Sequence, residues 1–157
     1  MKRLSAREAP AHADARKPGR AGEPDIDIHV PQSLVLSTEA FDEFMTENDL
    51  KEIPKGHLSD AQISEKFLNA RIPKGLQRSL KLVLAHLRYP LAVRSSSLLE
   101  DALFQPFAGI YRTYMLPNQH SDIDLRLERL AQAIKMVYAS TFMEAPRAYA
   151  KSTMHRT

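Results

Sequence analysis

The sequence predicts a mixed fold of helices and strands (α/β, or α+β), in which the helices pack on a small mixed sheet. Apolar residues recur every three or four positions in four separate stretches, which is typical of helices with one buried face. A short apolar run at 91–93 follows the third stretch directly, and a β-rich segment at 110–116 comes after it. A helix that leads straight into a strand is typical of an α/β arrangement.

The first predicted element is a strand pair, or one interrupted strand, near the start of the folded region. Its apolar side chains fall on even positions: Ile28, Val30, Leu34 and Leu36. Pro31 lies between them and favours a break or an edge strand, because proline cannot donate a hydrogen bond to a neighbouring strand.

Three helices are predicted before the strand at 91–93. Thr38 is placed to cap the first helix, and the second begins at the capping box that runs from Ser59 to Gln62. Pro73 begins the third helix and Pro90 ends it. The positions expected to face inward are Phe41, Phe44 and Met45, then Ile63, Phe67 and Leu68, then Leu76, Leu80, Val83, Leu84 and Leu87.

The longest predicted helix follows, with Ser121 as its cap. Its apolar stripe consists of Ile123, Leu127, Leu130, Ile134 and Val137. Arg126, Arg129 and Lys135 are expected to lie mostly on the solvent side of this helix. Phe142 and Tyr149 indicate a further helical piece after it.

The composition sets limits on chemistry and location. The chain of 157 residues is long enough for one domain with a proper core. It contains no cysteine, which excludes disulfides, thiolate metal sites and cysteine nucleophiles. No apolar run approaches the ~20 residues that cross a bilayer, and no signal peptide is recognisable. We therefore expect a cytoplasmic protein with no membrane partner.

The net charge of +3 belongs to residues 1–24, where six basic side chains outnumber three acidic ones. Residues 25–157 carry 16 of each sign. The first 24 residues are rich in Ala, Pro and Gly without apolar periodicity, so we expect a disordered basic tail before a domain at 25–157. The tail has no aromatic residue, so nucleic acid is not expected as a partner.

The most informative stretch runs from Pro90 to Asn118. Arg94 directly follows the apolar run, and small hydroxyl residues, Ser95 and Ser96 among them, come next. A planar, permanently charged guanidinium with hydroxyl and backbone donors beside it is suited to bind phosphate oxygens. Without further context, a solvated or salt-bridged arginine is the commoner interpretation of such a residue.

The order of three short motifs gives that context. VRSSS at 93–97, then Glu100-Asp101, then Phe107-Ala108-Gly109, resembles the N-terminal ATP-binding domain of the pyruvate phosphate dikinase and phosphoenolpyruvate synthase family. The similarity extends from about residue 26 to about residue 149. It implies a partial, ATP-grasp-like nucleotide-binding lobe that uses ATP and Mg²⁺.

The resemblance implies a role for each matching residue. Arg94 would contact the nucleotide's phosphates, with Ser95, Ser96 and the Phe107-Ala108-Gly109 turn as lesser contributors. Glu100 and Asp101 are weak candidates for a magnesium pair. The preferred alternative is that they cap or anchor the loop, or pair with Arg94.

The family also implies an ATP-dependent phosphotransferase of the dikinase type. Its second ATP lobe, Gly-rich lysine segment, phosphohistidine domain and pyruvate-binding barrel have no counterpart here, so we expect an incomplete chain that is inactive alone. Whether it is an enzyme stays open. The alternatives are a non-catalytic nucleotide-binding regulatory module, or an interaction fragment that docks on a partner supplying the missing lobe.

Other kinds of site have little support. Neither a P-loop pattern nor a G-x-G-x-x-G pattern occurs. The six histidines include no pair at helical spacing, which argues against a zinc site. The serines at 95–97 have no histidine and acid partner nearby in the sequence, so nucleophilic serine chemistry is not expected.

Overall fold

A computed structural model describes residues 32–55, 57–96 and 112–144 of the chain. The chain divides into two units, 1–38 and 39–157. In the first unit, residues 32–37 have no regular secondary structure, so the strand expected at Leu34 and Leu36 is wrong for these residues. Ile28, Val30, the basic tail and the boundary at residue 25 lie outside the described residues.

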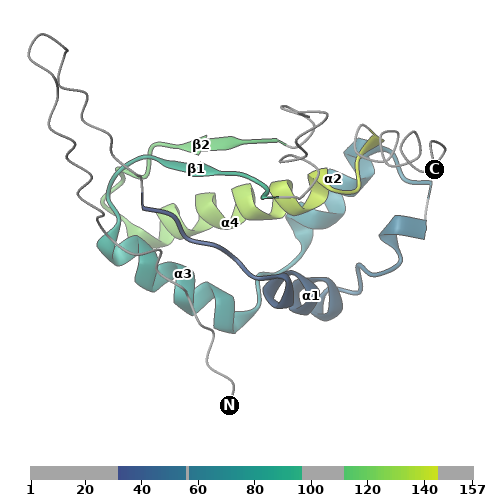
Figure 1. Cartoon of the computed structure of the whole chain (residues 1–157), viewed down its shortest axis with the longest axis horizontal. Helices are drawn as coiled ribbons and strands as arrows, with labels where there is room; N and C mark the ends of the chain where they lie inside the picture. The colour runs from purple at the N-terminus through teal and green to yellow at the C-terminus, as the bar shows by residue number, and fades with distance from the viewer. Residues whose placement is uncertain (1–31, 56, 97–111, 145–157) are drawn as a thin grey trace, which may run out of the picture. The chain divides into compact units, whose positions relative to one another are not determined.

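The second unit contains four helices and two short strands in its described part (Figure 1). In chain order these are α1 (Thr38–Glu47), a 3₁₀ turn (Ile53–Lys55), α2 (Asp60–Asn69), α3 (Lys74–His86), β1 (Leu91–Val93), β2 (Tyr114–Leu116) and α4 (Ile123–Ser140). α4 packs against α2, α3 and both strands, which makes it the central element of this unit. The predicted class, helices packed on a small sheet, is confirmed.

The two strands pair antiparallel, with Leu91 opposite Leu116 and Val93 opposite Tyr114. These four side chains are half-buried, and the strands pack on α4. The pair between them, Ala92 and Met115, is exposed, and Met115 keeps 69% of its surface in solvent. β2 covers only the end of the segment predicted at 110–116. Residues 112–113 have no regular secondary structure, and residues 110–111 lie outside the described part.

Two of the predicted helix starts are confirmed and one is wrong. The Ser59 hydroxyl accepts a hydrogen bond from the Gln62 amide, and the Gln62 side chain accepts one from the Ser59 amide in return. Pro73 directly precedes α3. The cap of α4 is Asp122 rather than Ser121, and its Oδ1 accepts from the Asp124 amide at 2.8 Å. A carboxylate at this position is also favoured by the positive end of the helix dipole.

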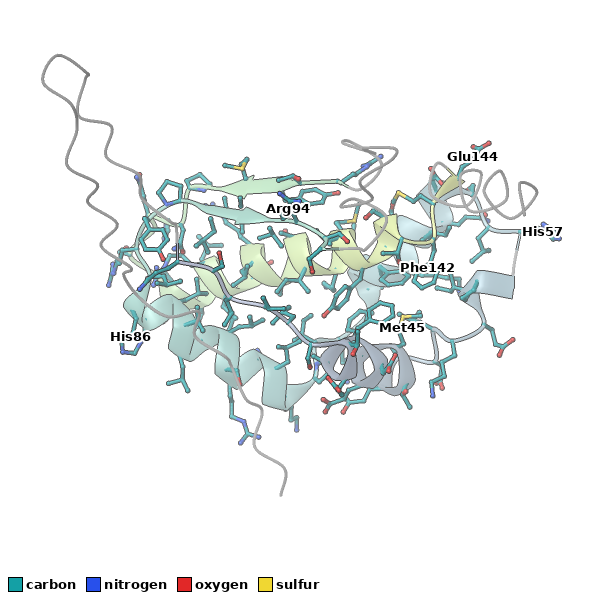
Figure 2. The ribbon with its side chains drawn as sticks, in the orientation of Figure 1. Met45, His57, His86, Arg94, Phe142 and Glu144 are labelled. Atoms are coloured by element: carbon teal, nitrogen blue, oxygen red, sulfur yellow. The ribbon has the colours of Figure 1, made fainter. Side chains whose placement is uncertain are left out.

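Aromatic rings hold α1, α2 and α4 together. The Phe41 and Tyr138 rings meet edge to face at 4.9 Å, and Phe44 lies 5.9 Å from Phe67. Figure 2 shows Phe142, just after α4, near Met45 of α1, and both residues belong to this core. The predicted apolar faces of α1 and α2 are therefore confirmed.

The expectation for Leu68 is wrong. Its side chain is 41% exposed, whereas Ile63 and Phe67 of the same helix are fully buried. The inward side chains of α3 (Leu76, Leu80 and Leu84) are buried as predicted, and this helix packs on α4.

Candidate functional site

The candidate phosphate contact, Arg94, is the first residue after β1. Figure 2 shows it at the end of the strand pair. The side chain is exposed, and its Nε donates a hydrogen bond to the carbonyl of Ser95 at 3.3 Å. Ser95 is half-buried and Ser96 is exposed. The C-terminal end of β1 thus presents a permanently charged guanidinium and two hydroxyls, which are donors suited to phosphate oxygens.

The other residues proposed for the site cannot be placed beside Arg94. Phe107, Ala108 and Gly109 lie outside the described residues, as do Glu100 and Asp101. The structure therefore brings together Arg94, Ser95 and Ser96, which are also neighbours in the chain, and leaves the remaining site residues untested.

A second cation lies at the same end of the strand pair. Val93 pairs with Tyr114, so Arg112 precedes β2 by two residues where Arg94 follows β1 by one. Arg112 is exposed. Sequence reasoning missed it, although pairing the two predicted strands antiparallel would have brought both arginines to one end of the sheet. Two permanent positive charges at one strand end favour a ligand with several negative charges.

An open groove of about 240 Å³ lies between β2, α4 and the end of α2. Its lining combines apolar side chains with three polar ones: Leu68, Leu116, Ala133 and Met136 with Tyr114, Arg129 and Gln132. A mostly apolar hollow with a few polar groups is typical of small-molecule sites. Tyr114 is the strand partner of Val93, the residue before Arg94, but Arg94 itself does not line the groove.

A buried arginine fixes the opposite end of the strand pair. Arg126 was expected on the solvent side of its helix, and this is wrong, since only 3% of its surface is exposed. One guanidinium nitrogen donates to the Leu84 carbonyl at 2.9 Å, and the other donates to the Leu87 carbonyl at 3.1 Å. These carbonyls belong to the last turn of α3, whose negative dipole end favours a cation.

Asn118 completes this arrangement. Its side-chain amide donates to the carbonyls of Leu87 and Tyr89, at 2.9 and 3.0 Å, and its oxygen lies 3.3 Å from Arg126 Nη1. The backbone of Asn118 has a φ of 53°, in the left-handed region that asparagine tolerates better than most residues. We call Arg126 and Asn118 the Arg–Asn clamp. It joins the segment that enters β1 to the segment that leaves β2, and so positions the strand that ends at Arg94.

Lys135 was also expected to face mostly solvent, and it is instead half-buried. Its Nζ donates to the carbonyls of Leu68 and Ala70, at 2.6 and 3.2 Å, at the C-terminal end of α2. Burial lowers the pKa of Lys135, while the charge of Glu128 acts in the opposite direction. Arg126 and Lys135 therefore play the same part, because each places a cation of α4 on the final carbonyls of a helix packed against it.

In residues 32–55, 57–96 and 112–144, no three histidine or carboxylate side chains lie together in a group able to hold a metal ion. None of the described helices combines the length and the apolar character needed to cross a bilayer.

Comparison with known proteins identifies the family. The sequence profile described as pyruvate phosphate dikinase, AMP/ATP-binding domain, matches residues 19–156. No curated protein and no solved structure matches the chain. The profile covers most of the sequence, including α1–α4, both strands and Arg94. The chain therefore belongs to the family of pyruvate phosphate dikinase AMP/ATP-binding domains.

Proposed function

We propose that this chain binds ATP and that Arg94 contacts the nucleotide's phosphates. The observation that carries the proposal is the position of Arg94 at the end of β1, exposed and next to two serines, in a domain of the AMP/ATP-binding family. A guanidinium is planar and always charged, so it can hold two phosphate oxygens at once. Arg112, at the same strand end, adds a second cation within reach of a polyphosphate chain.

The remaining residues of the proposed site act around this contact. Ser95 and Ser96 would donate hydroxyl hydrogen bonds to phosphate oxygens. The Phe107-Ala108-Gly109 turn would approach the phosphates through its backbone, with Gly109 allowing the close contact. Mg²⁺ would bind together with ATP, and Glu100 and Asp101 are the weak candidates to coordinate it.

The proposal extends to the type of reaction. The family implies an ATP-grasp-like phosphotransferase, in which ATP's phosphoryl group passes to a histidine and then to pyruvate or another acceptor. Such transfer depends on positioning and charge neutralisation more than on covalent chemistry by the protein. We expect this chain alone to turn nothing over. We also expect it to bind ATP weakly, because an exposed charge contact contributes only about 0–1 kcal/mol.

The test is calorimetric titration of the whole chain with Mg-ATP. Three proteins are compared: the unmodified chain, Arg94→Ala, and Arg71→Ala as a matched control. Arg71 is also an exposed arginine, and only its backbone takes part in the hydrogen bonds to Asn48. The proposal expects binding that Arg94→Ala weakens by about three- to fivefold, the equivalent of ~1 kcal/mol at most, and that Arg71→Ala leaves unchanged.

Two results would count against this proposal. Equal affinity in all three proteins would remove Arg94 from the phosphate site. No heat of binding from a protein shown to be folded by circular dichroism would mean that this chain is not an ATP-binding module by itself.

One observation favours the alternative of a module that docks on a partner. Met115 projects from the exposed face of the strand pair, and Leu68 beside the groove is also exposed. Both side chains leave apolar surface uncovered, and docking on a partner would bury such surface. ATP binding distinguishes the two possibilities, because a nucleotide-binding regulatory module keeps measurable affinity and a docking module has no need of it.

A further inference from the structure

Opposite charges are separated onto two helices of the second unit. Residues 39–52, which include most of α1, contain six acidic side chains and one basic one. All six acidic residues are exposed. Glu43 and Glu47 lie one helical turn apart on α1, so their carboxylates form a row on one face. We call these two residues the acidic row.

Residues 71–88, which include all of α3, show the opposite pattern. They contain five Lys or Arg side chains and no acidic one. Lys74 and Arg78 are exposed and also lie one turn apart, which gives a basic row with the same spacing as the acidic row. Leu82, one turn further along, is 66% exposed and extends this face with an apolar side chain.

One charge of each row is placed against the dipole of its own helix. Glu47 is the last residue of α1, which has no basic residue in its last turn. Lys74 is the first residue of α3, which has no acidic residue in its first turn. Negative charge at a helix C-terminus and positive charge at an N-terminus are both unfavourable. These side chains therefore do not stabilise the helices that carry them.

The two rows belong to adjoining elements. Both helices lie on the side of α4 away from the strand pair (Figure 1). The Asn48 side chain, just after α1, donates to the carbonyl of Arg71 at 2.9 Å and accepts from the Arg71 amide at 2.7 Å. The end of α1 is thus fixed next to the start of α3. In Figure 2, oxygen-tipped side chains extend from α1 and nitrogen-tipped ones from α3 on this side.

We infer that this face binds a second copy of the chain, with the acidic row of each copy against the basic row of the other. A face that is acidic in one half and basic in the other is complementary to itself after a two-fold rotation, and two-fold dimers are the commonest protein oligomers. Each contact is then made twice. Because the charges are exposed, the association is weak and is screened by salt.

The first measurement is sedimentation equilibrium of the whole chain at two ionic strengths. At about 0.01 M the Debye length is ~30 Å, and at about 1 M it is ~3 Å. The inference expects a concentration-dependent dimer at low salt and a monomer at high salt. A monomer at both, or a dimer that salt does not affect, would overturn it.

Charge reversal identifies the partner face. Glu43→Lys with Glu47→Lys makes both rows basic, and Lys74→Glu with Arg78→Glu makes both rows acidic. Each double variant alone should be monomeric at low salt. An equimolar mixture should form a heterodimer, because each reversed row then faces a row of opposite charge in the other protein. The reversed charges at 47 and 74 suit their helix dipoles, so both variants should melt no lower than the unmodified chain.

Any other pattern contradicts the inference. Association that survives either reversal would exclude that row from the interface. A mixture that stays monomeric would show that the rows do not face each other. Loss of association in the Lys74→Glu, Arg78→Glu variant alone would show that the basic row contacts acidic side chains of the partner copy other than Glu43 and Glu47. Should a reversal variant unfold, Glu43→Gln with Glu47→Gln and Lys74→Gln with Arg78→Gln are each expected to weaken the dimer without repelling the partner.

Discussion

Replacing Arg126 with methionine tests the Arg–Asn clamp most severely. Methionine keeps most of the volume and the apolar stem of the side chain but removes the guanidinium. The Leu84 carbonyl, at the end of α3, then loses the hydrogen bond that Arg126 provides at 2.9 Å. The Leu87 carbonyl loses its contact at 3.1 Å but keeps the one from Asn118.

The cost follows from two opposing terms. A hydrogen bond from a charged donor contributes about 1.5–3 kcal/mol net, so two well-formed bonds give roughly 3–6 kcal/mol. Removing a buried charge also returns its desolvation penalty, which is several kcal/mol per ion. The negative end of the α3 dipole stabilises the buried guanidinium and so offsets part of that penalty. We therefore expect Arg126→Met to destabilise the fold by about 3 kcal/mol.

Thermal and urea unfolding measure this change. For a chain of this length, ~1 kcal/mol corresponds to about 2–4 °C in Tm, so a fall of roughly 10 °C is expected. Arg129→Met is the matched control, because Arg129 is an exposed arginine on the same helix and its loss should change stability by less than about 0.5 kcal/mol. If Arg126→Met unfolds at or above the temperature of the unmodified protein, the desolvation penalty outweighs the hydrogen bonds and our reasoning on the clamp is wrong.

Two further substitutions test neighbouring parts of the account. Asn118→Ala should cost about 3 kcal/mol in urea unfolding, since it loses two amide hydrogen bonds of about 1 kcal/mol each, loses the longer contact with Arg126 Nη1, and places alanine at a positive φ; Asn118→Gly should cost about 1 kcal/mol less, and equal costs would exclude the backbone contribution. Tyr138→Phe should raise stability by about 1 kcal/mol at neutral pH, because among the described residues the buried Tyr138 hydroxyl has no hydrogen-bond partner. Burial raises the pKa of Tyr138 from 10.0 to about 12. Below pH 10 the hydroxyl is protonated in both the folded and the unfolded chain. Between pH 10 and 12 it ionises only in the unfolded chain, so the free energy of unfolding falls as the pH rises through 12. The unmodified protein should lose about 1 kcal/mol more than Tyr138→Phe between neutral pH and about pH 11, and parallel losses would contradict this.

The periodic part of the fold could be predicted from the sequence. Phe44, Ile63, Phe67 and Leu80 follow helical spacing, and a side chain at such a position is buried because its helix has one apolar face. The capping box at Ser59 was also recognisable, because it depends on four consecutive residues.

The long-range polar contacts could not be predicted in the same way. Arg126 lies on α4 among charged neighbours, and by composition alone it belongs on the solvent side. Its burial depends on where the α3 carbonyls end in space, 42 residues earlier in the chain. Lys135 depends in the same way on the α2 carbonyls, 65 and 67 residues away. Periodicity indicates which side of a helix a side chain lies on, but it does not indicate which backbone carbonyls lack a hydrogen-bond donor.

The candidate site, too, could be predicted only in part from the sequence. A strand that ends at Arg94 was predicted from the run at 91–93, and the structure has it. Arg112 was missed, because its place beside Arg94 requires the antiparallel register of β1 and β2. The loop residues Phe107, Ala108 and Gly109 stay a prediction.

The most direct test of the central claim is a titration of isotope-labelled protein with ATP, followed by amide NMR chemical shifts. We expect the largest saturable shifts at Arg94, Ser95 and Ser96, with much smaller shifts at these amides when adenosine replaces ATP, since the phosphates make the contact. Shifts of equal size with adenosine, or shifts confined to amides of the groove between β2 and α4, would contradict a phosphate site at the end of β1.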